Sequence, residues 1–224
     1  MNSTKKTARI VGILFLLIFA IGVTMYQFLQ SPLFAEDFLT ATAANGNQII
    51  TSTLLGIISG ALSIIIAVLL LPIFKKYSYN LAYIYLAFSI LEFAAIFVDN
   101  ISVLSLLDLS TAYIDSGNEA SSSFNLMGTL LYERHAWTHY FSLLMSCFPV
   151  FVLYYTLYVA RLIPRAISIF GIVAALLMCV HMVASIFGHG ISMDMMIPMA
   201  LVQLLFPIWL IVKGLKPALE PTVA

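Results

Sequence analysis

Six long apolar stretches are the feature that most constrains what this chain can fold into. They cover about residues 9–29, 49–74, 81–106, 134–160, 166–187 and 195–213. A transmembrane helix needs about 20 largely apolar residues to cross about 30 Å of hydrocarbon, whereas a barrel strand shows about 10 residues of alternating polarity. Backbone groups in lipid must be hydrogen-bonded internally, so long spanning segments form helices. The sequence therefore predicts an all-α bundle of six transmembrane helices.

The composition excludes the soluble classes of protein. Apolar residues make up 62% of the 224 residues and charged residues 9%, whereas soluble domains have about 45–50% and about 25%. Such a chain lacks the polar surface of a water-soluble domain and the basic surface of a nucleic-acid-binding module. The expected partner is the lipid bilayer, and we expect no contact with nucleic acid.

The basic residues predict the orientation of the bundle. Nine of the ten fall on one side of the predicted membrane, next to the two termini and in the two short connections. They are Lys5, Lys6, Arg9, Lys75, Lys76, Arg161, Arg165, Lys213 and Lys216. The other side is acidic: Glu36, Asp37, Asp108, Asp115, Glu119, Glu133 and Asp194, with Arg134 as its basic residue. Because cytoplasmic loops are rich in Lys and Arg, both termini are predicted to be cytoplasmic.

The chain is predicted to form a single domain over residues 1–224, with an uncleaved first span. Two longer connections, at 30–48 and 107–133, lie on the acidic side, and the second is expected to hold a short interfacial helix at about 122–131. Gly56 and Gly60 form a GxxxG stripe in the second span. Small residues allow close helix packing in membranes. The stripe therefore predicts packing within the chain or, alternatively, a homo-oligomer through this face.

Ionisable residues inside a membrane are costly and indicate function by default. Glu92 lies near the middle of the third span and Asp99 lies seven residues further on. Seven residues make almost two helical turns, so both carboxylates share one face of the helix. Further polar residues lie at the outer ends of later spans, where adjoining helices would form one polar pocket. The candidates for this pocket are Glu92, Asp99, Arg134, His135, His139, His181 and Gln203.

Three interpretations of this pocket stay open. In the first, it is a hydrogen-bonded network that only fixes helix packing, as in a structural or regulatory subunit. In the second, His135, His139 and His181 hold a metal or haem, since imidazoles are common metal ligands and the first two are spaced i, i+4. In the third, the protein handles a small molecule, ion or lipid, with Glu92 as the protonatable group, because transporter sites often lie at the bilayer midplane.

Several stretches resemble a known family. They are residues 6–12, Leu91-Glu92, residues 106–110 followed by Tyr113, residues 162–171, and Trp209-Leu210-Ile211-Val212-Lys213-Gly214. This pattern resembles the bacterial membrane proteins grouped as domain of unknown function 4386, over nearly the whole chain. The resemblance implies a bacterial inner-membrane protein and supplies no catalytic residues.

The chain departs from that family pattern at two positions. Family members often have an Arg three residues before the Glu of the third span, where this chain has Ser89. They also often have Gln-Glu in the last span, where this chain has Gln203-Leu204. These departures leave Glu92 without a family partner and direct attention to Asp99 and the histidines. The function predicted first is therefore non-enzymatic handling of a small solute, and a metal- or haem-dependent enzyme is the alternative.

Overall fold

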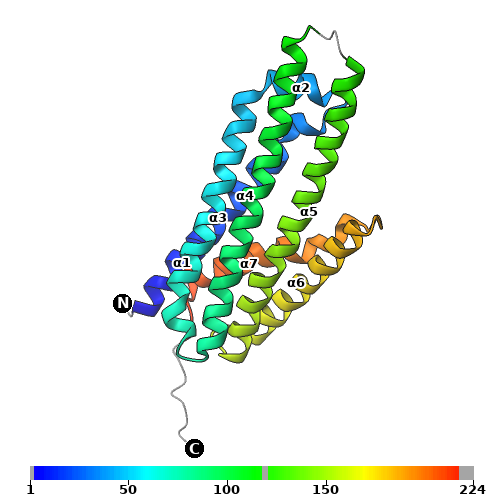
Figure 1. The fold of residues 1–224 in the computed structure, drawn as a ribbon. Helices are drawn as coiled ribbons and strands as arrows, with labels where there is room; N and C mark the ends of the chain where they lie inside the picture. The colour runs from blue at the N-terminus through cyan, green and yellow to red at the C-terminus, as the bar shows by residue number, and fades with distance from the viewer. Residues whose placement is uncertain (1–2, 118–120, 217–224) are drawn as a thin grey trace, which may run out of the picture.

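The computed structural model describes residues 3–117 and 121–216, and these ranges are helical without a β-strand (Figure 1). In chain order the elements are α1 (Ser3–Thr24), the π-helical turn η1 (Met25–Leu29), the 3-10 turn η2 (Ser31–Phe34), α2 (Phe38–Ala44), α3 (Gly46–Phe74), α4 (Tyr79–Asp115), α5 (Ser121–Val159), α6 (Arg165–Ile186), the 3-10 turn η3 (Met193–Met196) and α7 (Ile197–Val212).

Six of these helical segments are long and apolar enough to cross a membrane. They run from Thr4 to Leu29, Gly46 to Phe74, Tyr79 to Asp115, Ser122 to Val159, Arg165 to Ile186 and Met193 to Val212. Each contains nearly all of one predicted span, so the prediction of a six-helix membrane bundle is confirmed. The protein is a multi-pass membrane protein.

The prediction was wrong for the connection at 107–133. The structure continues α4 to Asp115 and begins α5 at Ser121, so most of this connection is helix, and the expected separate helix at 122–131 is part of α5. The two helices have 37 and 39 residues, or about 55 Å each at 1.5 Å per residue. They extend well past the end of α6 that leads to η3 (Figure 1). Hydropathy identified the apolar part of each helix and missed the helical turns that continue beyond this part.

A second apolar cluster explains why these extra turns are helical. Val103, Leu106 and Leu107 of α4 are buried against Leu33 and Leu39 from the η2–α2 segment. Burying apolar side chains stabilises a helix beyond its intrinsic propensity. The segment from 30 to 44, predicted as a loop, thereby packs on the extended end of α4.

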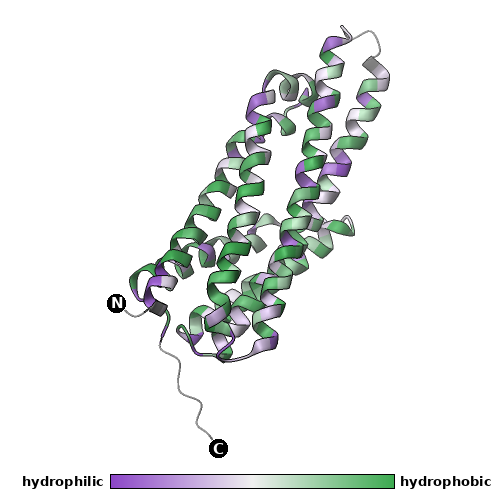
Figure 2. Cartoon of the chain, turned by 60° about the vertical axis from the view of Figure 1, so that its left-hand side comes forward, coloured by the Kyte–Doolittle hydropathy of each residue, from purple (hydrophilic) through white to green (hydrophobic). Residues whose placement is uncertain are grey.

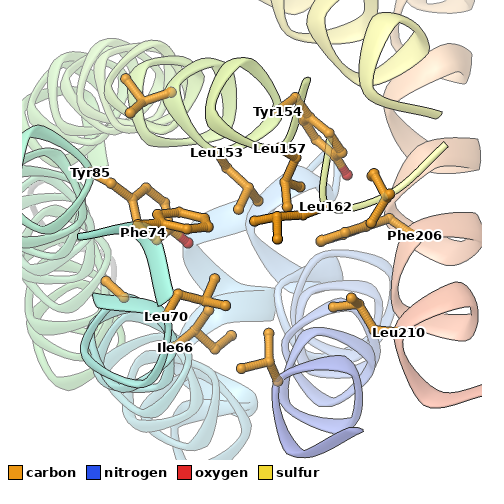
Figure 3. Close-up of a cluster of buried hydrophobic side chains, with 14 of the residues drawn as sticks. Ile66, Leu70, Phe74, Tyr85, Leu153, Tyr154, Leu157, Leu162, Phe206 and Leu210 are labelled. Atoms are coloured by element: carbon orange, nitrogen blue, oxygen red, sulfur yellow. The ribbon is translucent and has the colours of Figure 1, made fainter. Parts of the chain in front are cut away.

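The six spans form a ring in chain order. α1 packs against α3, α3 against α4, α4 against α5, α5 against α6, α6 against α7, and α7 returns to α1. The interior of the ring is filled by side chains from several spans, among them Leu70 and Phe74 of α3, Leu157 of α5 and Leu210 of α7 (Figure 3). Leu162, from the turn between α5 and α6, also lies in this core.

The glycine stripe of the second span packs inside the chain. A Cβ atom on Gly56 would lie 2.7 Å from Asn100 Nδ2, and one on Gly60 would clash with the ring of Phe93. Both contacts come from α4, so this stripe is the surface on which α3 and α4 approach each other. The structure thus shows the intrachain alternative of the sequence analysis, and the stripe is buried within one copy.

The two ends of the bundle differ in charge. α1 begins and α7 ends at the same end (Figure 1), where a Cβ atom on Gly214 would lie 3.6 Å from Lys5 Cγ and the Lys216 amide donates to the Leu162 carbonyl at 2.8 Å. We call this the basic end, because all nine basic residues other than Arg134 lie at or near it. The opposite, acidic end holds Asp37, Asp108 and Glu133, whereas Glu119 lies outside the described residues. Figure 2 shows hydrophobic residues along the helices between these ends.

Candidate functional site

Asp99 is the centre of a polar cluster between α4 and α5. Its Oδ1 lies 3.1 Å from Nδ1 of His135 and accepts a hydrogen bond from Thr138 Oγ1 at 2.9 Å. Its Oδ2 lies 3.2 Å from Nδ1 of His139. The residues 135, 138 and 139 share one face of α5, as the i, i+3 and i+4 spacing requires. One carboxylate of α4 therefore holds two imidazoles of α5, and we call this group the Asp99 cluster.

An ionised Asp99 assigns the hydrogen positions on the two rings. An ionised carboxylate only accepts hydrogen bonds, so each Nδ1 that faces Asp99 carries the hydrogen and donates it. In a neutral imidazole the other nitrogen is then an acceptor. Both His135 and His139 therefore have Nε2 lone pairs available for a proton, a hydrogen-bond donor or a metal ion.

A cleft of about 130 Å³ opens beside this cluster. It is lined by Tyr26, Gln30, Phe34, Tyr132, His135, Ala136, His139 and Tyr140. The ring of Tyr26 meets that of His139 edge to face, with the ring centroids 4.9 Å apart. Drug-sized ligands occupy pockets of about 300–1,000 Å³, so this cleft suits a much smaller molecule.

Two buried amide side chains, one in the cleft lining and one next to Asp99 in the sequence, have unpartnered atoms. Gln30 is 1% exposed; its Nε2 lies 3.5 Å from Ser52 Oγ, and its Oε1 has no hydrogen-bond partner. Asn100, next to Asp99 in α4, is 5% exposed, and its Nδ2 has no partner. A buried polar atom without a partner costs about 1–3 kcal/mol. Such atoms are retained where they serve a ligand, a water molecule or a change of state.

Glu92 lies deeper, about 10 Å along α4 from Asp99 at 1.5 Å per residue. It is half-buried and accepts a hydrogen bond from Ser63 Oγ of α3 at 2.8 Å. On α5, Ser142 Oγ donates to the His139 carbonyl at 2.9 Å and Ser146 Oγ donates to the Ser142 carbonyl at 3.1 Å. Between Ser146 and His139, Ser142 continues the polar face of α5 and is 3% exposed. A stripe of polar side chains thus extends along α4 and α5 from the Asp99 cluster toward Glu92.

The other predicted pocket residues lie apart from the cluster. Arg134 of α5 is exposed, and among the described residues no ion pair joins it to Asp99. Gln203 of α7 is also exposed. His181 of α6 is 4% exposed, and its Nδ1 is buried without a partner. The structure thus brings together Asp99, His135 and His139 and connects Glu92 to them through α5.

The predicted three-histidine ligand set does not form in the part of the chain that the structure describes. No three His, Cys, Asp or Glu side chains in residues 3–117 and 121–216 are grouped so that they could hold a metal ion. His135 and His139 are joined by Asp99, with ring centroids 5.9 Å apart. A metal site at His135 and His139 would therefore need further ligands other than His, Cys, Asp or Glu side chains.

Sequence reasoning missed the side chains that complete the cleft. Tyr26 and Gln30 come from the end of the first span, and Tyr132 and Tyr140 flank the histidines on α5. The two α5 tyrosines carry a detectable signal, because they lie three residues before His135 and one residue after His139. The contribution of the first span depends on which helices adjoin, and a single sequence does not supply that.

A second, larger hollow is apolar. It holds about 280 Å³ between α6 and α7 and is lined by Ile167, Leu205, Ile208, Trp209, Val212 and Lys213. Five of these six residues are hydrophobic, and Lys213 lies at the basic end. Its chemistry suits a lipid chain rather than a reaction, so the Asp99 cluster remains the candidate site.

The fold and the cluster together define a multi-pass α-helical membrane protein with a buried carboxylate–histidine site. The chain belongs to the family described as domain of unknown function (DUF4386), whose model matches residues 10–214. The family resemblance noted in the sequence is thereby confirmed. No curated protein and no solved structure matches the chain.

Proposed function

We propose that this protein handles a small solute that enters the cleft at the acidic end, with proton exchange at Glu92. The observation that carries the proposal is the polar stripe that joins the Asp99 cluster to Glu92. Ionisable side chains within membrane spans commonly mark substrate and proton pathways. Here Asp99 and Glu92 lie at two depths of α4. A proton path from a water-facing cleft to the membrane interior needs ionisable groups at such successive depths.

The contacts of the stripe support proton movement. The Nε2 atoms of His135 and His139 can accept a proton. The hydroxyl groups of Ser142 and Ser146 donate to backbone carbonyls of α5 and keep lone pairs that can accept. At the far end of the stripe, Ser63 donates to Glu92. Solute binding at the cleft and the protonation of Glu92 are thus coupled through α4 and α5.

The decisive experiment compares Glu92→Gln with the wild type in sealed proteoliposomes that contain a pH-sensitive dye. We expect an imposed proton gradient to dissipate faster with wild-type protein than in empty vesicles, and this excess rate to disappear in Glu92→Gln. Gln keeps the size and the hydrogen bond from Ser63 while removing the proton. Glu133→Gln, an exposed change outside the hydrocarbon, is the matched control and should keep the wild-type rate.

The same experiment tests the structural alternative. A network that only fixes helix packing would give no excess proton flux in the wild type, and Glu92→Gln would alter only the unfolding temperature in detergent. Equal flux in the wild type and Glu92→Gln would also overturn the proposal.

A second candidate is a metal- or haem-dependent enzyme. It is favoured by one observation: the carboxylate of Asp99 binds Nδ1 of His135 and His139, an arrangement that orients metal-binding histidines elsewhere. A stoichiometric metal in protein purified without chelator, lost in His135→Ala, would favour this candidate over solute handling.

We also propose the cellular placement. The basic end, which carries both termini, faces the cytoplasm of a bacterial cell, and the cleft opens toward the outer face of the inner membrane. The uneven distribution of Lys and Arg supports this orientation, and the family resemblance supports a bacterial inner membrane.

A further inference from the structure

We infer that the cleft beside the Asp99 cluster binds a small organic ammonium ion. This inference rests on the proposed function, because it names the class of solute that the site would handle. It is carried by the cleft lining, which combines aromatic side chains with two histidines that contact the buried carboxylate of Asp99.

The lining is rich in aromatic side chains. Four of the eight lining residues are Tyr or Phe: Tyr26, Phe34, Tyr132 and Tyr140. Aromatic faces attract ammonium groups, more strongly where water is excluded. None of the eight lining residues is Lys or Arg, so no fixed positive side chain competes for these faces.

The polar atoms of the lining include acceptors for a donor ligand. His135 and His139 give their Nδ1 hydrogens to an ionised Asp99, which leaves Nε2 of each ring as an acceptor. The hydroxyl groups of Tyr26, Tyr132 and Tyr140 can accept as well as donate, and Gln30 has a buried Oε1 without a partner. A protonated amine brings the hydrogen-bond donors that these acceptors can bind.

Charge points to the same class of ligand. Asp99 brings one buried carboxylate to the cluster, where it contacts two imidazole rings and Thr138 and has no Lys or Arg ion-pair partner among the described residues. Glu36, Asp37 and Glu133 are exposed at the same end of the bundle. An acidic surface around a cleft raises the local concentration of cations.

The size of the cleft limits the ligand to a few heavy atoms. About 130 Å³ is far below the volume of a drug-sized pocket. Binding free energy reaches at most about −1.5 kcal/mol per heavy atom for the smallest ligands. For propylammonium, which has four heavy atoms, this ceiling means a dissociation constant no lower than about 40 μM.

The test measures binding of propylammonium to the full-length protein in nanodiscs of zwitterionic phosphatidylcholine, by ligand-observed NMR against empty nanodiscs. 1-Propanol and propionate are compared at equal ionic strength as neutral and anionic probes of similar size. We expect propylammonium to bind saturably and the other two not to bind. Binding of propionate or 1-propanol without propylammonium would overturn the inference.

Two pairs of variants locate the site. Asp99→Asn should weaken propylammonium binding by about tenfold or more, since it removes the buried counter-charge, whereas Asp108→Asn, an exposed change on the same helix, should not. Tyr26→Leu should weaken binding, whereas Tyr26→Phe, which keeps the aromatic face, should retain it. The tyrosine pair decides the question if Asp99→Asn fails to fold. Equal binding in Tyr26→Leu and the wild type would overturn the inference.

The two proposals fail separately. Propylammonium binding is measured at equilibrium without a proton gradient, so it does not require Glu92 to exchange a proton. If the wild-type protein gave no excess proton flux, the proposed function would be refuted. If propylammonium did not bind, only the class of ligand would be refuted.

Discussion

At the scale of single residues, the two histidines that share Asp99 are not equivalent. The side chain of His135 is 5% exposed and that of His139 is 25% exposed. Leaving a buried acceptor without its hydrogen-bond partner costs about 1–3 kcal/mol, and more for a charged group, whereas a partly hydrated group regains hydrogen bonds from water. We therefore expect His135→Ala to lower the unfolding temperature in detergent clearly more than His139→Ala does.

A double-mutant cycle checks that this loss arises from the carboxylate. In an Asp99→Asn background the buried charge is absent, so His135→Ala should cost less than it does in the wild type. A coupling of about 0.5–3 kcal/mol is typical of residues in one hydrogen-bond network. Equal costs of His135→Ala in the two backgrounds would show that its effect comes from lost packing alone.

At the scale of helices, the approach of α5 and α6 depends on one glycine. A Cβ atom on Gly171 would clash with the ring of Tyr154, a buried side chain that also packs edge to face on Phe206 of α7. The ring has no free space to move into, and overpacking of this kind costs about 1–3 kcal/mol. We expect Gly171→Ala to lower the thermal stability measured in detergent.

Gly22→Ala is the matched control for this prediction. Gly22 lies in α1, and a Cβ atom there would meet nothing within 4 Å. Alanine favours a helix over glycine by about 1 kcal/mol, so this variant should be as stable as the wild type or more stable. If Gly171→Ala were as stable as the wild type, α5 and α6 could not be packed as closely as they are in the structure.

The helices also show what a single sequence can and cannot predict. Apolar runs identified all six spans, because lipid requires about 20 apolar residues in a row. The turns of α4 beyond Leu107 depend on the η2–α2 segment that packs on them, and hydropathy does not detect such contacts. The same reason applies to the site: the helical spacing placed His135 and His139 on one face, whereas Tyr26 and Gln30 join them through the tertiary arrangement of α1 and α5.

At the scale of the whole molecule, the uneven distribution of charge predicts how the bundle lies in its membrane. Nine basic residues gather at the end where α1 begins and α7 ends, while exposed Asp37, Asp108 and Asp115 lie at the other. A membrane-impermeant maleimide applied to intact cells should label Asp115→Cys and leave Lys216→Cys unlabelled until the cells are opened. The background for both variants is Cys147→Ala with Cys179→Ala, which removes the two native thiols.

The orientation decides which compartment supplies the ligand of the cleft. With the acidic end outside, Tyr26, His135 and His139 face the external medium, and Glu92 lies further along the path toward the cytoplasm. Labelling of Lys216→Cys in intact cells would reverse this direction and would require a cytoplasmic solute. In either orientation the cleft and Glu92 remain on one polar stripe. The labelling result therefore determines from which side of the membrane solute and proton would enter this stripe at the cleft.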